Sequence, residues 1–492
     1  MINEHQVQTD MKSSRDRPED HTTRNKLVIA LLLVSAFVVI LNETIMGVAL
    51  PHLMADLGIT ASSAQWLTTA FMLTMAVVIP VTGYLLQRLN TRPVFILAMS
   101  LFSAGTLISG LAPGFPVLVI GRIVQACGTA IMMPLLMTTV MNLVPPATRG
   151  KTMGNISIVI SVAPAIGPTL SGLVLSMLDW RWMFFLVLPI ALCALALGAA
   201  RIQNVTVPTK APIDVLSVPL SAVGFGSFVY GLSGLGEAAL HPPVVSPWIP
   251  LLIGAAVIAL FVMRQRQLQK QDRALLDLRT LKSKAFTIAT LLMAILMMSM
   301  FGVFILLPIY LQNVIGLSTL QTGLLLLPGG LIMGLCAPTV GRLFDKYGPA
   351  PLVVPGAILF SAVMWALTLV QQDTPVWMLL AAHIVLSVGL ALMFTPLFTV
   401  SLGSLPPKLY SHGSALIGTT QQVAGAAGTA LFVAIMTSQA ARLSVTGAER
   451  LAATTGGIRA AFFCGAIISL VAVGAAFLLK KPPTPTDGAS GH

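Results

Sequence analysis

The sequence predicts an all-α integral membrane protein with fourteen transmembrane helices. Hydrophobic residues make up 56% of its 492 residues and charged residues 9%, a balance far from that of a soluble domain. The apolar residues form continuous runs of about 20 residues, the length that a helix needs to cross a bilayer. The strands of a membrane β-barrel alternate in polarity over shorter segments, so that class is excluded.

A window of about 20 residues, moved along the sequence, marks each helix in turn. The predicted spans are 27–50, 65–86, 94–112, 117–140, 152–177, 182–200, 214–236, 247–263, 285–311, 320–341, 351–370, 376–400, 413–437 and 460–479. Residues 1–25 are polar and mixed in charge, which predicts a disordered cytoplasmic tail without a cleavable signal. The first span then serves as the insertion signal. Residues 481–492 are predicted to be a second cytoplasmic tail.

The distribution of cations predicts how the helices are oriented. With the N-terminus inside, the cytoplasmic tails and loops carry 23 of the 28 Lys and Arg residues, and the external loops carry four. Loops rich in Lys and Arg stay in the cytoplasm, so both termini are predicted to lie there. The same topology accounts for the net charge of +12. Since no basic patch is interleaved with aromatic residues, a nucleic-acid partner is not expected.

Two short cytoplasmic turns resemble each other and indicate a duplicated chain. They read GYLLQRLNTR at 83–92 and GRLFDKYG at 341–348, each with a leading Gly and a basic residue five positions later. Duplicated halves are one way to build a transporter, with the substrate site between them. The predicted parts are an N-terminal six-helix bundle at 26–200, two inserted helices at 213–264, a basic cytoplasmic linker at 265–284 and a C-terminal six-helix bundle at 285–480. The linker is either a short amphipathic helix on the inner membrane surface or a solvated connector.

Glu43 is the only carboxylate well inside a predicted span. A lone carboxyl group in hydrocarbon is costly unless it is protonated, paired or hydrated, so an acid kept there is functional by default. We predict that Glu43 carries protons. The alternative is a structural acid, satisfied by hydrogen bonds from Asn42, Thr44 or a neighbouring helix.

Arg122 is the only cation within a predicted span. Counted from the outer ends of their helices, Glu43 and Arg122 both lie about 10 Å below the outer surface, at a rise of 1.5 Å per residue. The two side chains are therefore predicted to share a polar network. The alternative is an Arg122 side chain that only extends to the outer interface.

Several polar side chains in or near the spans are candidates for the lining of a substrate cavity. They are Asn42, Gln65, Gln125, Asn155, Gln312, Asn313, Gln421 and Gln422. Each of them alternatively makes a hydrogen bond between helices. His383 is a second titratable candidate, with a packed or hydrogen-bonded histidine as the alternative. The 24 Met and 21 Phe residues provide adaptable apolar surface for varied ligands, or face lipid and core.

The sequence gives no support to other classes of function. The four cysteines all lie inside spans, at 127, 193, 336 and 464, which indicates neither a disulfide framework nor a metal site. A nucleotide-binding loop of the GxxxxGK[ST] type is absent, so ATP hydrolysis is not expected. Because no catalytic constellation assembles at one membrane depth, the chain is not expected to be an enzyme.

Four segments resemble the signatures of one transport family. They are LNETIMGVALP at 41–51, LVIGRIVQACGTA at 118–130, the fifth-span residues Gly154, Ala163, Gly167, Pro168 and Gly172, and DWRWMFF at 179–185. With the repeated turns, they resemble the fourteen-helix drug:proton antiporters of the major facilitator superfamily, which include the lincomycin-resistance and quaternary-ammonium-resistance exporters. The resemblance covers nearly the whole chain. In the family, the acid of the first helix usually stands one position earlier, where this chain has Asn42. The family also usually has an acid in each of the two repeated turns. Here the first turn has Gln87 instead, and the second turn keeps the acid as Asp345.

The resemblance implies a major facilitator fold, with two six-helix bundles and two inserted helices in the bacterial inner membrane. It implies a proton-coupled multidrug antiporter that exports hydrophobic compounds, cationic ones above all, by alternating access and without a cofactor. Glu43 and Arg122 would couple protons, and the gate would consist of Gly83, Gln87, Arg88, Arg92, Asp345, Gly167 and Pro168. Membrane lipids are further expected partners, and a monomer is the expected state. The alternatives are an exporter of an endogenous metabolite or lipid and a nutrient symporter.

Overall fold

Fourteen long helices form the computed structural model, which describes residues 18–59, 61–204, 214–238 and 245–479. The helices are α2 (Pro18–Leu57), α3 (Ala61–Arg88), α4 (Thr91–Gly110), α5 (Phe115–Leu143), α6 (Arg149–Met177), α7 (Trp182–Arg201), α8 (Ser217–Ala238), α9 (Trp248–Leu268), α10 (Lys284–Asn313), α11 (Thr319–Tyr347), α12 (Ala350–Leu367), α13 (Val376–Gly403), α14 (Tyr410–Val445) and α15 (Arg450–Ala476). Short 3-10 helices are η1 (Pro146–Thr148), η2 (Gln269–Gln271), η3 (Leu278–Lys282) and η4 (Pro407–Leu409). All fourteen long helices contain a stretch apolar enough to cross a membrane, which confirms the predicted spans.

The main differences from prediction lie at helix ends. The predicted tail at 1–25 is wrong for its last part, because α2 begins at Pro18; residues 1–17 lie outside the described residues. Proline is favourable at the first position of a helix. α15 begins at Arg450 rather than at 460, because the Arg, Thr and Gly residues there lower the hydropathy without ending the helix.

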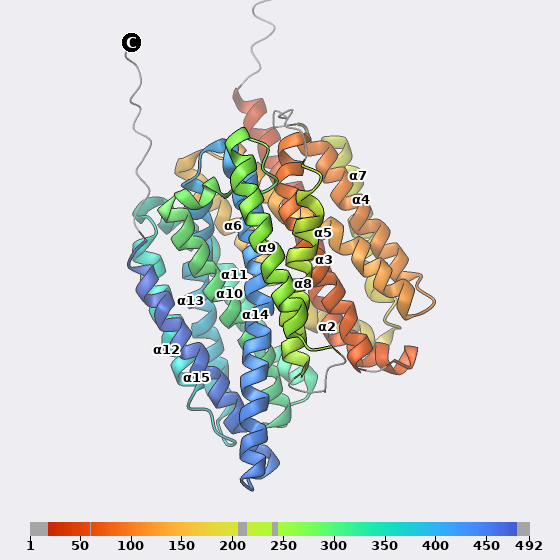
Figure 1. Ribbon diagram of the computed structural model, residues 1–492, viewed down its shortest axis with the longest axis vertical. Helices are drawn as coiled ribbons and strands as arrows, with labels where there is room; N and C mark the ends of the chain where they lie inside the picture. The colour runs from red at the N-terminus through yellow and green to blue at the C-terminus, as the bar shows by residue number, and fades with distance from the viewer. Residues whose placement is uncertain (1–17, 60, 205–213, 239–244, 480–492) are drawn as a thin grey trace, which may run out of the picture.

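The helices form two halves with the same internal arrangement (Figure 1). In the first half, extensive contacts join α4 to α5, α2 to α6, α3 to α5 and α4 to α7. In the second half, the corresponding contacts join α12 to α13, α10 to α14, α11 to α13 and α12 to α15. The duplication indicated by the two turns therefore extends to the packing of all twelve helices, and the predicted fold class is confirmed.

The halves meet along two equivalent pairs of helices, which we call the α6–α11 seam and the α3–α14 seam. The α6–α11 seam is the more extensive. Small residues line it in antiparallel register: Gly150 faces Gly341, and Gly154 faces the backbone of Ala337. Because these residues have little or no side chain, the two helices approach closely.

Adding one methyl group at Gly154 is expected to loosen this seam. A Cβ at Gly154 would lie 2.5 Å from the carbonyl oxygen of Ala337, so Gly154→Ala should lower the stability of the protein by about 1–3 kcal/mol, measured by thermal inactivation in detergent. Gly172→Ala in the same helix is the control, since nothing lies within 4 Å of its Cβ position. Equal melting of the two variants would show that the close approach at Gly154 is not needed.

The inserted helices cover only one of the two seams. α8 contacts both α3 and α14, where Ala76, Val229 and Ala426 form one cluster from three helices. α9 packs on α8, with Gly231 against the backbone of Leu251. Figure 1 shows the two helices in green across the front of the molecule. Among the described helices, α8 and α9 make no extensive contact with α6 or α11, so the insertion breaks the symmetry of the duplicated halves.

The linker that follows α9 packs against the bundle. Both sequence interpretations, an amphipathic surface helix and a solvated connector, are wrong for its central part, because residues 274–277 are buried. Leu275 and Leu276 belong to a hydrophobic cluster with Tyr84 of α3 and Ala415 of α14. The linker thus lies at the end of the bundle that holds the α3–α4 and α11–α12 turns. We call this end the inner side, because the sequence predicts that it faces the cytoplasm.

Candidate functional site

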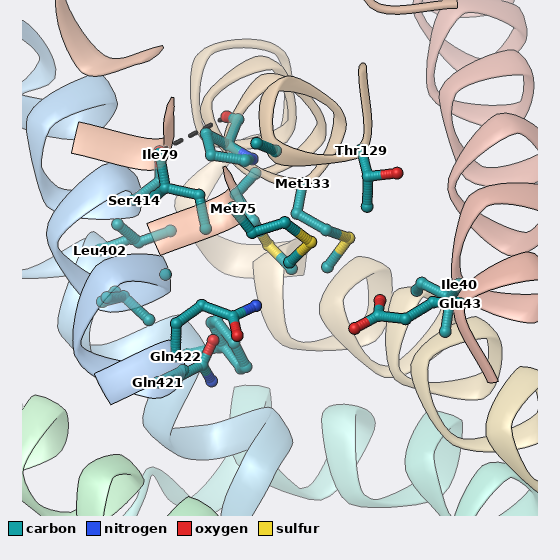
Figure 2. Close-up of a pocket in the computed structure, with 16 residues that line it drawn as sticks. Ile40, Glu43, Met75, Ile79, Thr129, Met133, Leu402, Ser414, Gln421 and Gln422 are labelled. Carbon is teal, nitrogen blue, oxygen red and sulfur yellow. Dashed lines mark hydrogen bonds between the residues drawn. The ribbon is translucent and has the colours of Figure 1, made fainter. Parts of the chain in front are cut away.

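A cavity of about 100 Å³ lies between the two halves (Figure 2). Helices α2, α3 and α5 of the first half and α13 and α14 of the second supply its walls. Polar lining residues are Glu43, Thr129, Ser414, Gln421 and Gln422, and three methionines, at 75, 133 and 137, contribute thioether surface. The methionines were foreseen only as a class, because their spacing does not distinguish a cavity wall from a helix core.

Glu43 faces this cavity from α2. Figure 2 shows its carboxylate pointing across the space toward Gln421 and Gln422 on α14. No hydrogen bond or ion pair joins the carboxylate to another side chain in the described part of the chain. Asn42 and Thr44 do not satisfy it as the structural alternative requires, because Asn42 Nδ2 has no hydrogen-bond partner and Thr44 Oγ1 donates to the carbonyl of Leu41.

Arg122 is buried in the first half, with 1% of its surface exposed. The alternative in which it extends to the outer interface is therefore wrong. Its Nη1 donates to Asn42 Oδ1 at 3.2 Å and to Gln125 Oε1 at 2.6 Å. Its guanidinium carbon lies 4.1 Å from the centre of the Phe71 ring, close enough for a cation–π contact. Gln125 Nε2 in turn donates to Thr106 Oγ1 at 2.8 Å, which ties the network to α4.

The hydrogen bonds of Arg122 end at Asn42, the residue that precedes Glu43 in the chain. Successive residues point about 100° apart around a helix, so Asn42 is directed to Arg122 while Glu43 is directed to the cavity. No ion pair within 4.0 Å joins Glu43 and Arg122 among the described side chains. Asn42 Nδ2 and Arg122 Nε are buried without a hydrogen-bond partner. The one-residue shift of the acid thus separates the proton-site candidate from the arginine network.

The structure brings only some of the predicted amides to the cavity. Gln421 and Gln422 line it, and Gln421 Nε2 is buried without a partner. Asn42 and Gln125 belong instead to the Arg122 network. Three predicted lining residues lie elsewhere, because Asn155 is exposed on α6 and Gln312 and Asn313 end α10. The side chain of Gln65 lies outside the described residues.

His383 is packed between two helices of the second half. Its Nε2 lies 3.1 Å from the carbonyl oxygen of Leu326 on α11, and its ring is in close contact with Gly329. This placement matches the packed, hydrogen-bonded histidine that the sequence left open as an alternative.

Asp345 joins the two halves at the inner side. Its two carboxylate oxygens accept hydrogen bonds from the backbone N–H groups of Gly150 and Lys151, each at 2.8 Å. These N–H groups belong to the first turn of α6, where unpaired donors and the helix dipole favour an anion. Its counterpart Gln87 donates from Nε2 to the carbonyl oxygen of Lys408 at 2.9 Å.

The partners of these two turns are themselves repeated in the sequence. They read PPATRGK at 145–151 and PPKLYSH at 406–412, and each forms a 3-10 helix followed by the start of a long helix. The equivalent residues Arg149 and Tyr410 meet, with the guanidinium 5.6 Å from the ring centre. This second repeat is the signal that would have located the contact partners from the sequence.

Further hydrogen bonds cross between the described halves inside the bundle. Thr138 of α5 pairs with Ser414 of α14 at 3.1 Å, and Ser157 of α6 pairs with Thr395 of α13 at 2.8 Å. Both link helices of opposite halves. The described halves are thus joined by polar contacts at the inner side and directly next to the cavity.

The remaining gate candidates lie differently. Gly83 of α3 is in close contact with His412 and Ala415 across the α3–α14 seam. Arg88 donates to the Tyr84 hydroxyl and the backbone of Arg92 to Asn204, both within the first half. Gly167 packs against Thr44 of α2, next to Glu43 in the sequence. The side chain of Pro168 lies outside the described residues.

The segment at 179–185 contacts the end of α2 at the outer end of the first half. Trp180 is buried and its Nε1 donates to Asp56 Oδ2 at 2.8 Å. Arg181 lies 4.2 Å from the centre of the Trp180 ring and 3.5 Å from the same carboxylate. The segment therefore fixes the outer end of α2, the helix that carries Glu43.

Comparison with known proteins gives matches along most of the chain. The family model of the Major Facilitator Superfamily matches residues 32–429. The uncharacterised transporter YcnB of Bacillus subtilis is 40% identical over 470 residues, 95% of this chain and 98% of the relative. The lincomycin resistance protein LmrB of Listeria monocytogenes is 40% identical over 459 residues, 92% of this chain and 96% of the relative. A multidrug resistance protein B homolog of Mycobacterium tuberculosis is 31% identical over 433 residues, 87% of this chain and 78% of the relative.

Solved structures match the fold at low sequence identity. The human organic anion transporter MFSD10 superimposes with a TM-score of 0.67 at 15% identity, over 93% of this chain and 99% of that protein. Given the two repeated halves, the cavity between them and the matching family model and relatives, the chain belongs to the major facilitator superfamily, as a multi-pass bacterial membrane transporter related to lincomycin and multidrug resistance proteins.

Proposed function

We propose that this protein is a proton-coupled antiporter that exports hydrophobic, cationic drug-like compounds by alternating access. The observation that carries the proposal is Glu43, a carboxylate within the membrane that faces the cavity between the halves. The names of the relatives, lincomycin resistance and multidrug resistance proteins, support drugs as the exported compounds. Protons are the second substrate, lipids surround a monomer, and no cofactor takes part.

Competition for Glu43 couples the two movements. An ionised carboxylate in an apolar cavity needs either a proton or a nearby cation to offset its desolvation. A cationic compound that binds from the inner side replaces the proton, and a proton arriving from the outer side later replaces the compound. Arg122 does not neutralise Glu43 directly, because its guanidinium is hydrogen-bonded to Asn42 and Gln125.

The other side chains that line the cavity suit varied apolar compounds. Met75 and Met133 lie above Glu43 and the α14 amides in Figure 2, and their flexible, polarisable side chains adapt to different shapes. The unpartnered Gln421 Nε2 provides one hydrogen-bond donor for an acceptor on the compound. Glu43 thus provides specificity for charge, while the methionines tolerate compounds of different shapes.

The contacts at the inner side form the inner gate of this cycle. Asp345, bonded to the first turn of α6, and Gln87, bonded to the carbonyl of Lys408, hold the halves together while the cavity faces outward. Both contacts must be released before the cavity opens to the inner side.

Transport by the purified protein in lipid vesicles with an imposed pH gradient tests this function. A lipophilic cationic dye is expected to accumulate in an acidic lumen, as protons leave, and an uncoupler should abolish the accumulation. Vesicles without protein and vesicles without a pH gradient are the controls. Dye that moves in the same direction as the protons would instead indicate a symporter, and no transport in any gradient would contradict drug export.

A further inference from the structure

The two seams between the halves are held at the inner side by unequal contacts. On the α6–α11 seam, the Asp345 carboxylate accepts two backbone hydrogen bonds from a helix N-terminus. Hydrogen bonds to an ionised group are about twice as strong as those between neutral groups. On the α3–α14 seam, the equivalent Gln87 makes a neutral bond to the carbonyl of Lys408, and the helices contact each other less extensively. The α3–α14 seam would therefore open first if nothing else held it.

The linker covers this weaker seam at the inner side. Leu275 and Leu276 are each 1% exposed and lie in one hydrophobic cluster with Tyr84 of α3 and Ala415 of α14. The following 3-10 helix, η3, contacts both α14 and α10. The linker therefore buries apolar side chains against both halves at the seam where their direct contact is less extensive.

Buried polar contacts hold the linker in this place. Gln265 of α9 is fully buried; its Oε1 accepts from the backbone N–H of Leu275 at 2.8 Å, and its Nε2 donates to Ser217 at the start of α8. Asp277 is 3% exposed and pairs with Arg279, whose Nε lies 2.8 Å from its Oδ2. The shape of the linker is thus fixed by the inserted helices at one end and by an internal ion pair at the other.

Two carboxylates beside the linker, Asp214 and Asp272, stay ionised in the physiological pH range. Hydrogen bonds from Arg264 lower the pKa of Asp214, next to α8, to about 2, and the bond from Arg279 lowers the pKa of Asp272. A carboxylate with a lowered pKa contributes stability above its unfolded pKa of about 3.9 and loses it only as the pH falls through the folded value. The bonds of Asp214 and Asp272 to their arginines therefore remain formed at physiological pH.

A histidine connects the linker to both helices of the seam. His412 of α14 is 3% exposed, with its ring against Gly83 of α3. On the linker side it faces the backbone of Leu275. Its Nδ1, the atom beside Gly83, is buried without a partner, so the contact with α3 is made by packing.

We propose that linker residues 274–279 form the second latch of the inner gate, which takes the place of the carboxylate that the first turn lacks at Gln87. They hold α3 against α14 from the inner side and must move away before the inner side opens. The latch rests on the proposed function only in requiring an inner side that opens, and it needs neither a drug nor a proton gradient.

Labelling of a single cysteine in the cavity tests the latch. Met137→Cys, in a background without the four native cysteines, places a thiol in the cavity wall on α5. Its rate of reaction with a membrane-impermeant maleimide in inside-out vesicles reports opening of the inner side. Arg279→Gln, which leaves buried Asp277 without its partner, should raise this rate at least about fivefold, the lower end of usual coupling strengths. The matched control is Arg273→Gln, which removes the same charge from an exposed position of the same linker and should leave the rate unchanged.

A second pair of variants keeps the test decisive. Leu276→Ser removes an apolar contact at the seam and should also speed labelling, whereas Leu281→Ser, at a position 44% exposed, should not. A background that retains only Cys464 reports unfolding, and its labelling should stay constant. Wild-type labelling rates in folded Arg279→Gln and Leu276→Ser would overturn the latch. So would equal acceleration by the exposed controls. Because no transport is measured, loss of drug export would leave this result standing.

Discussion

Glu43→Gln is expected to reduce proton-driven dye export to the level of vesicles without the protein. The amide has nearly the size of the carboxylate and keeps the cavity shape, but it can neither take up a proton nor balance a cation. Glu43→Asp should retain partial activity, since the charge remains while the shorter side chain withdraws it from the cavity. The measurement is uncoupler-sensitive efflux of a lipophilic cation at matched expression.

A matched acid elsewhere separates this effect from a general loss of charge. Glu449→Gln removes an exposed carboxylate just before α15 and should leave export unchanged. Full, uncoupler-sensitive transport by Glu43→Gln would show that another group carries the proton, and His383 or His412 would then be the next candidates within the described helices.

Arg122→Lys is expected to be the second most damaging change. The planar guanidinium bonds Asn42 and Gln125 while lying over Phe71, an arrangement that a compact ammonium group does not reproduce. Losing one hydrogen bond to a charged group costs about 1.5–3 kcal/mol of stability. Because Asn42 directly precedes Glu43, the loss also shifts the carboxylate, and export should fall about tenfold or more.

Thermal inactivation in detergent and dye export together check this prediction. Arg450→Lys, an exposed arginine at the start of α15, is the control and should match the wild type in both. An Arg122→Lys variant with normal stability and normal export would show that charge alone, without the hydrogen-bond geometry, is what the site requires.

Much of this fold was predictable because the membrane imposes long apolar runs. All fourteen spans were found, and errors arose where helices continue through Ser, Thr, Gly and Arg, as at the start of α15. The burial of the linker is not evident from the sequence for a related reason. Its basic residues suggested a surface segment, but the short run ALLD at 274–277 is what the bundle buries, and such a run has no helical periodicity to reveal its partner.

The candidate site was predictable one residue at a time but not as an arrangement. Glu43 and Arg122 stand out because charge in hydrocarbon is rare. Sequence depth placed them at one level, yet depth does not determine direction around a helix, so the pairing of Arg122 with Asn42 emerged only from the structure. Amide side chains are common in membrane helices, so the sequence does not show which of them line a cavity. Gln421 lines it, whereas Asn155 and Gln312 lie elsewhere.

The one-sided position of α8 and α9 bears on how a compound in the bilayer would reach the cavity. In the proposed cycle, opening of the inner gate would part both seams, and each would expose a lateral window to the lipid of the inner leaflet. On the α3–α14 side, α8 packs against both halves and would block that window. A hydrophobic compound diffusing in the leaflet would therefore be admitted from the α6–α11 side alone, so that a duplicated, symmetric scaffold acquires a single direction of uptake from the membrane.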